Sequence, residues 1–201
     1  MLNLLDDALA GFLREIVPLS ARDVDIAFDA PDRDWSAQLS GPTVNLFLWD
    51  VRPNLSEREH GLRVVTDEDG AARREGPRPR LECRYLITAW TTEVGDEHAL
   101  LGQVMAALLL NPVLTAGHIK APLVADPLPA ITLRTGGDTD SSDFWSAIGG
   151  QLKPGLDVSI TITVDAAAVL AAGPPVQVVD ATVREFDRDL ADLRPPGSLG
   201  P

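Results

Sequence analysis

The chain has 201 residues, of which 45% are hydrophobic, and it carries a formal net charge of −13. A chain of this length buries roughly 70% of its unfolded surface and holds a core without metal ions or disulfides. The acidic excess disfavours nucleic acids and anionic membrane surfaces as partners, because binding to either depends on clustered Lys and Arg. We therefore expect a globular protein that contacts neither.

The cysteine content and the N-terminal residues indicate in which cellular compartment the protein is expected. Cys83 is the single cysteine, which excludes an internal disulfide and any zinc site built from cysteines. Asp6 and Asp7 lie where a secretory signal would carry positive charge. No apolar run approaches the ~20 residues that a membrane span requires. We expect a cytoplasmic protein.

Segments with the periodicity of regular structure fill much of the first ninety residues. Apolar residues recur at three- and four-residue steps from Leu2 to Ile16, which predicts an amphipathic helix that ends at Pro18. Runs of β-branched and aromatic residues predict strands over 24–28, 43–51 and 80–92. The prolines, glycine and charges of 29–42 predict a loop.

The composition changes at 53–79 to charged residues, Gly and Pro, which predicts an exposed hairpin. Asp67-Glu68-Asp69-Gly70 supplies its turn signal. The segment has little apolar area, so it gains little from packing against its own domain. We expect it to reach a neighbouring subunit, and its candidate interface residues are Glu57, Arg58, Arg63, Arg73 and Arg74.

The second half of the chain predicts two helices and further strands. Asp96 is expected to cap a helix that Asn111-Pro112 closes and whose buried side is Leu100, Leu101, Val104, Met105 and Leu108. A short helix is expected over 143–148, and strands over 130–134, 158–164 and 176–186. The strand over 158–164 alternates regularly and is expected to be buried on one side only.

These elements together predict a mixed α/β (α+β) fold. In it, a largely antiparallel sheet is covered on one face by two main helices. The domain is expected to span 1–186, with the charged hairpin at 53–79 exposed. A flexible C-terminal tail is expected at 187–201.

No histidine or acidic cluster has the spacing of a metal site. His60, His98 and His118 lie in three separate segments, without the i, i+4 partner of a helical site. A third group, Asp138, Asp140 and Asp143, resembles part of a calcium loop. Such a loop needs Gly at its sixth position and Glu at its twelfth, where this chain has Asp143 and Gly149.

Motifs for nucleotide binding and acyl transfer are also missing from the sequence, since it contains no phosphate-binding glycine loop and no nucleophile elbow. Cys83 alternates with Leu81 and Tyr85 in a strand pattern, whereas a catalytic thiol needs a polar and partly exposed setting. We expect a non-enzyme with no catalytic, cofactor-binding or metal-binding residues.

Four blocks of sequence carry a resemblance to a known family. They are the N-terminal helix, V-N-L-F-L-W-D-V-R-P-N at 44–54, P-R-L-E-C-R-Y-L-I-T-A-W at 79–90 with D-E-H-A-L-L-G and N-P-V-L after it, and F-W-S-A-I-G-G-Q-L-K-P-G-L-D-V-S-I-T-I-T-V at 144–164. In this order, over about residues 1–186, the chain resembles the cap, or tube-terminator, proteins of extracellular contractile injection systems of the antifeeding-prophage type.

The resemblance implies a structural cap that terminates the inner tube and sheath of a phage-tail-like contractile particle. It implies a ring of six copies at the distal end of the particle, with the inner tube protein and the sheath protein as partners. No catalytic residue is carried over from the family.

The C-terminal run 176–186 has two interpretations. The resemblance implies sheath subunits that link by exchanged strands, so the run, with Val178 and Val183, would pair with a sheath edge. The alternative is an ordinary edge strand of the domain's own sheet.

Three other functions stay open from the sequence. One is a terminator or adaptor of a related phage-like tail. Another is a small-ligand-binding protein or enzyme whose site assembles from scattered residues without a motif. The third is an effector carried by the particle.

Overall fold

The computed structural model describes most of the chain. It consists of a central sheet, the helices that pack on it and one inserted hairpin. The described residues are 1–17, 24–57, 60–66, 70, 72–134 and 141–165. The expected strand over 176–186, with Val178 and Val183, and the expected tail at 187–201 lie outside them.

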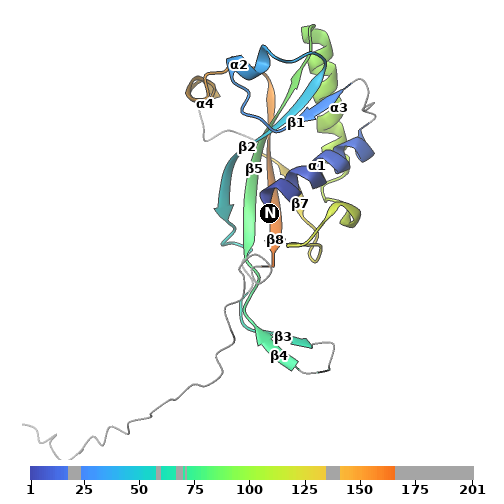
Figure 1. Cartoon of the computed structure of the whole chain (residues 1–201), viewed down its shortest axis with the longest axis vertical. Coiled ribbons are helices and arrows are strands. Elements are labelled where there is room, and N and C mark those ends of the chain that lie inside the picture. Colours follow the sequence, from blue (N-terminus) through green and yellow to red (C-terminus); the bar gives the residue numbers. More distant parts are fainter. Residues whose placement is uncertain (18–23, 58–59, 67–69, 71, 135–140, 166–201) are drawn as a thin grey trace, which may run out of the picture. The chain divides into compact units, whose positions relative to one another are not determined.

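One six-stranded sheet forms the centre of the described structure (Figure 1). Its strands follow the spatial order β1, β2, β5, β8, β6, and β7 also pairs with β8. Only the β1–β2 pair is parallel; the others are antiparallel. The strand bounds are Asp25–Ala27 (β1), Thr43–Pro53 (β2), Arg80–Trp90 (β5), Leu123–Val124 (β6), Ala130–Leu133 (β7) and Gly155–Val164 (β8).

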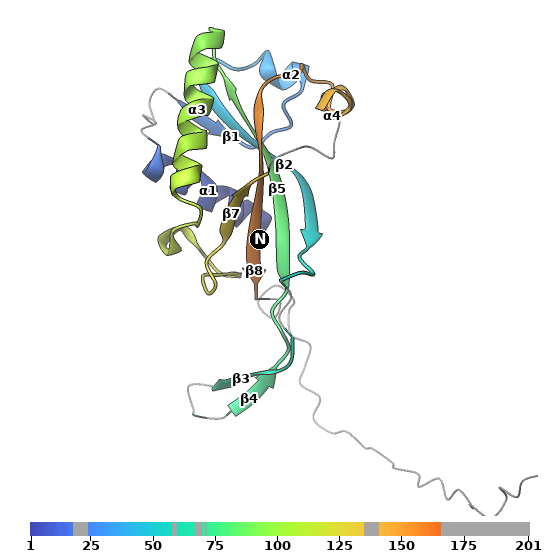
Figure 2. The same ribbon diagram turned by 180° about the vertical axis from the view of Figure 1, so that it is seen from behind.

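Two long helices, α1 (Leu2–Ile16) and α3 (Val94–Leu110), cover one face of this sheet. Figures 1 and 2 both show α1 and α3 on one side of the sheet and the short helix α4 (Ser141–Ala147) on the other. Apolar side chains at alternate strand positions join those of the two helices in one core; they include Leu9, Phe12, Leu46, Tyr85, Ile87, Val104, Leu108, Ile160 and Ile162. The expected fold class is confirmed.

The opposite face of the sheet is polar and buried, which the alternation over 158–164 did not predict. Ser159, Thr161 and Thr163 of β8 are buried, although Ser159 and Thr161, at 6% and 9% exposed, are less so than the isoleucines between them. A bulge lies in β2 between Leu48 and Asp50. Asn54, just after β2, donates a 3.3 Å hydrogen bond to the hydroxyl of Thr161, across the intervening β5. The sheet therefore curls over its own polar face.

Two local details differ from the expectations. The expected loop 29–42 contains a short helix, α2 (Arg33–Ser36), because the Asp32 carboxylate accepts a 2.7 Å hydrogen bond from the backbone N–H of Trp35. Helix α3 begins one turn earlier than expected. Its N-cap is Glu93, and Asp96 lies within its first turn.

The expected hairpin segment contains a second, two-stranded sheet. Strands β3 (Arg63–Thr66) and β4 (Ala72–Glu75) pair antiparallel, with Arg63 opposite Glu75 and Val64 opposite Arg74. Gly70, in the turn, has φ of +80°, a conformation that residues with a Cβ rarely adopt. We call residues 55–79, inserted between β2 and β5, the arm. Figure 1 shows β3 and β4 as a separate pair of strands.

Candidate interaction surface

Among the described residues, two histidines and one buried cysteine are side chains that could act as metal ligands or in catalysis. His98 lies in the first turns of α3 and is exposed, and His118 Nε2 lies 2.7 Å from a carboxylate oxygen of Glu15. Burial raises the pKa of the Cys83 thiol to about 12, with smaller contributions from Asp6 and Glu82. A thiol in this state is unreactive near neutral pH.

The described residues contain neither a metal-binding cluster nor a helix that could span a membrane. No group of three or more His, Cys, Asp or Glu side chains in the described residues is placed to hold a metal ion. Asp138 and Asp140 of the acidic loop lie outside these residues. No helix in the described part of the chain is long and apolar enough to cross a bilayer.

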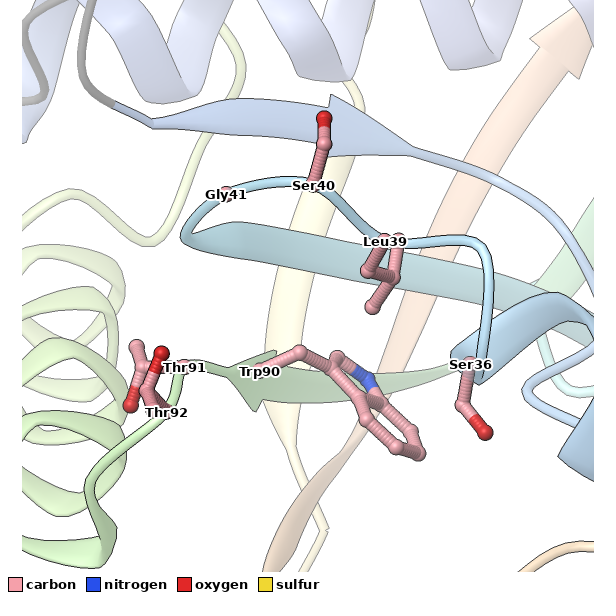
Figure 3. A pocket seen from close by; sticks show the side chains of 7 residues that line it. All are labelled: Ser36, Leu39, Ser40, Gly41, Trp90, Thr91 and Thr92. Carbon is pink, nitrogen blue, oxygen red and sulfur yellow. The ribbon is translucent and has the colours of Figure 1, made fainter.

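A small hollow at the end of β5 is lined by hydroxyl groups and one indole (Figure 3). It measures about 190 Å³, and its lining residues include Ser36, Ser40, Trp90, Thr91 and Thr92. The Trp90 ring contacts the Trp35 ring edge-on, and Lys153 Nζ lies 4.1 Å from its centroid. Lys153 itself pairs with Glu97. None of the lining side chains titrates near neutral pH, so the hollow offers no general acid or base.

The arm is fixed at its base by polar contacts from both ends. The Arg80 guanidinium lies 2.9 Å from a carboxylate oxygen of Glu57. The Asn54 side-chain oxygen accepts hydrogen bonds from the Ser56 hydroxyl and the Glu57 N–H, and the Asn54 N–H donates to the Arg80 carbonyl. These bonds join the point where the chain enters the arm to the point where it returns.

The remaining candidate interface residues are distributed along the arm. Arg63, Arg73 and Arg74 belong to the paired strands, and the Arg74 side chain is exposed. Arg58 lies outside the described residues. The structure therefore places Glu57 at the base of the arm and three of the arginines on its strands.

Beyond the base of the arm, a charged cluster braces the polar face of the sheet. Arg84 pairs with Asp157 at 2.5 Å, and its guanidinium carbon lies 4.1 Å from the centroid of the Trp49 ring. Glu82 accepts hydrogen bonds from Ser159 at 2.6 Å and Arg134 at 3.2 Å. Each charge has an opposite charge beside it, so the cluster holds β5 to β8.

The outer face of α3 is the surface that the sequence did not reveal. Met105, expected in the core, is 41% exposed, and Leu109 and Leu110 are 61% and 81% exposed. Leu100, Val104, Ala107 and Leu108 face the sheet. From Ala99 on, α3 is apolar around its circumference except at Gln103, so periodicity could not show which side is buried. The apolar residues on all sides of this part of the helix were the available signal, because such helices are typically buried on more than one side.

Comparison with known protein families shows to which family the chain belongs. The family described as the Pvc16 N-terminal domain matches residues 4–178. The chain belongs to the Pvc16 N-terminal domain family. The match covers both long helices, the whole sheet and the arm. A comparison with curated proteins found no match.

Two solved structures are similar to this Pvc16 N-terminal domain. One is the sheath/tube terminator of PVC, an extracellular contractile injection system, in its extended state, with 23% identity and a TM-score of 0.62. The other is the tube-terminating cap of the anti-feeding prophage, with 23% identity and a TM-score of 0.61.

The two matches cover most of this chain but a smaller part of each matched chain. They cover 94% and 89% of this chain, but 65% and 60% of the matched chains, so this chain spans less than two thirds of either. They show a common fold. The resemblance stated from the sequence is confirmed.

Proposed function

We propose that this chain is a structural cap that terminates the inner tube and sheath of a phage-tail-like contractile injection system. The observation that supports this proposal is the family match over 4–178, together with the fold shared with two terminators. The growing end of a tube or sheath presents unsatisfied subunit surfaces and strand edges, which a terminator must cover. A fold built for such contacts needs no catalytic site.

The proposed assembly is a ring of six copies at the distal end of the particle, formed in the cytoplasm. It rests on the last tube ring and contacts the last sheath ring. A ring closes by head-to-tail contacts, so each subunit presents two different surfaces to its neighbours. The arm and the outer face of α3 are two such surfaces in this chain.

Within the arm, we assign different roles to the candidate residues. Glu57 pairs with Arg80 and so fixes the base of the arm. Arg58, Arg63, Arg73 and Arg74 are proposed to reach a partner. Val178 and Val183, in the run 176–186, are proposed to pair with a sheath edge through backbone hydrogen bonds.

The experiment that tests the cap function is imaging of particles assembled without this gene. We expect tubes and sheaths of uncontrolled length, or sheaths that contract early. Normal, length-controlled and sheathed particles would show that the proposed function is wrong. Restoring the gene on a plasmid controls for effects on its neighbours.

A further inference from the structure

The two ends of the arm are both linked to β8. Where the chain returns to β5, the Pro79 carbonyl accepts a 3.0 Å hydrogen bond from the N–H of Val164, the last residue of β8. Where the chain leaves β2, the Asn54 side chain reaches Thr161 of the same strand. The arm is inserted between β2 and β5, but its base therefore rests on three strands.

Asn54 is the side chain that makes this connection at the entry to the arm. Its amide nitrogen donates to the Thr161 hydroxyl and to a Glu57 carboxylate oxygen, each at 3.3 Å. Its amide oxygen accepts from the Ser56 hydroxyl at 2.8 Å and from the Glu57 N–H at 3.1 Å. An Asn side chain has two N–H donors and two acceptor sites on its oxygen, so all of them are used. These four bonds fix one orientation of the amide.

The same side chain turns the chain out of the sheet. Asn side chains compete with the strand ladder, because they accept hydrogen bonds from main-chain N–H groups a few residues later. The bond from the Glu57 N–H to Asn54 follows directly on the end of β2 at Pro53. Asn54 thus determines where the chain leaves the sheet and, through Thr161, on which strand the turn rests.

Apolar packing does not fill the base of the arm. An open hollow of about 260 Å³ lies there, and its lining residues include Pro53, Leu55, Pro77, Pro79 and Leu81. Leu55 is 72% exposed. Because the apolar side chains leave this space unfilled, the direction of the arm depends on the polar contacts at its base. The prolines on both sides of the hollow restrict the main chain further, since their rings fix φ.

We propose that Asn54 is a positioning residue, which holds the arm in one direction on β8 before the arm meets a partner subunit. An arm whose direction is already fixed loses little conformational freedom on binding. It therefore binds more tightly than a freely moving arm with the same surface. The inference rests on the proposed function, in which the arm contributes to assembly, and it identifies the residue that prepares the arm for that contact.

The first test measures the direction of the arm by double electron–electron resonance between two spin labels. The labels are attached after Val64→Cys, at a position 63% exposed on the arm, and Gln38→Cys, at an exposed position next to α2. Cys83 is buried and should stay unlabelled. The distance distribution should be narrow in this background and about twofold broader after Asn54→Ala. A distribution that is broad from the start, or that Asn54→Ala leaves unchanged, overturns the inference.

A matched pair of substitutions isolates the bond to β8. Thr161→Val removes the hydroxyl that Asn54 contacts, and it should broaden the distance distribution. Thr163→Val, two residues later on the same face of β8, is the control, because the buried Thr163 hydroxyl has no hydrogen-bond partner among the described residues. Circular dichroism melting shows that each variant is folded. Equal widths in the two variants would show that the contact with Asn54 does not position the arm.

The second test measures assembly with the surface of the arm unchanged. With tube protein present, Thr161→Val should weaken ring formation about threefold to tenfold by mass photometry, because the arm must then be ordered during binding. Thr163→Val should assemble like the unchanged chain. If Thr161→Val broadens the distance distribution but assembles normally, the direction of the arm has no role in assembly and the inference is wrong.

The outcomes also separate this inference from the cap function. Spin-label distances are measured on the isolated chain, so they do not depend on what the chain caps. Narrow distances that neither Asn54→Ala nor Thr161→Val broadens would overturn the inference and leave the cap function standing. Normal, length-controlled particles without the gene would remove the cap function, and with it the use of the arm in assembly.

Discussion

The hydroxyl of Tyr85 donates a 2.8 Å hydrogen bond to the carboxylate of Asp6, 79 residues earlier in the chain. Tyr85 is fully buried in β5, and Asp6 lies on α1. This bond joins the N-terminal helix to the middle of the sheet. It is a polar contact at the edge of the apolar core that α1 and β5 share.

Replacement of the hydroxyl should therefore loosen α1. Tyr85→Phe is expected to lower the free energy of unfolding by about 1–2 kcal/mol, because the half-buried Asp6 carboxylate loses its donor. Urea unfolding followed by circular dichroism measures the change. Tyr85→Phe in an Asp6→Ala background should cost less, and an equal cost in both backgrounds would show that the bond does not contribute.

The same carboxylate predicts a pH dependence. Burial raises the pKa of Asp6, the Tyr85 hydrogen bond opposes this, and Asp7 raises it further. The folded state therefore holds the Asp6 proton more tightly than the unfolded state does. The contribution of Asp6 to the free energy of unfolding is complete in acid, and it is lost as the pH rises through the pKa of the folded state. Asp6→Asn should raise the melting temperature near neutral pH and bring no gain in acid. The same gain at both pH values contradicts this.

The Arg84–Asp157 pair supplies a third prediction. Arg84→Met should lower the free energy of unfolding by about 2–3 kcal/mol, less than for a fully buried pair because Asp157 is partly exposed. Adding Asp157→Asn to this variant should recover part of the loss, since it removes a carboxylate charge whose remaining partner, Arg134, lies 3.7 Å away. A double-mutant cycle in urea measures the coupling; additive losses would show that the two side chains are independent.

The arm is expected to contribute to assembly and little to folding. Replacing residues 61–76 with a short Gly-Ser linker, which keeps the Glu57–Arg80 pair, should change the melting temperature of the monomer by less than about 3 °C. The same variant should fail to form rings or to cap tubes. Glu57→Ala in the complete arm is the control for its base. A large loss of monomer stability would show that the arm packs in its own core.

The C-terminal run is tested by proline. Val178→Pro with Val183→Pro removes two backbone donors. If the run pairs with a sheath edge, the variant should still fold and cap tubes, but its sheaths should contract early. If the variant fails to fold, the strand belongs to the domain's own sheet. Val178→Ala with Val183→Ala keeps the donors and is the matched control.

Elements with a clear periodicity could be predicted from the sequence. Leu5, Leu9 and Phe12 mark the buried side of α1, and the β-branched runs mark β2 and β5, because local spacing alone decides which face is apolar. The turn signal at Gly70 likewise indicated the position of the β3–β4 pair. These features depend on residues close together in the sequence.

Features that depend on contacts between segments far apart in the sequence could not be predicted. The parallel β1–β2 pair and the contact of Asn54 with Thr161 require strand order and curvature, which local patterns do not encode. For the same reason, the Glu57–Arg80 pair at the base of the arm was not foreseen. The exposed position of Met105 depends on which side of α3, largely apolar after its first turn, meets the sheet.

The insertion of the arm between two adjacent core strands has a practical consequence. The ends of the arm are already held together by Asn54 and Arg80, so the entropy cost of a longer insertion grows only slowly with its length. Evolution could therefore change the length and sequence of the arm without refolding the domain. A foreign epitope inserted at this position should therefore leave the melting temperature of the domain nearly unchanged, even where it blocks assembly through the arm.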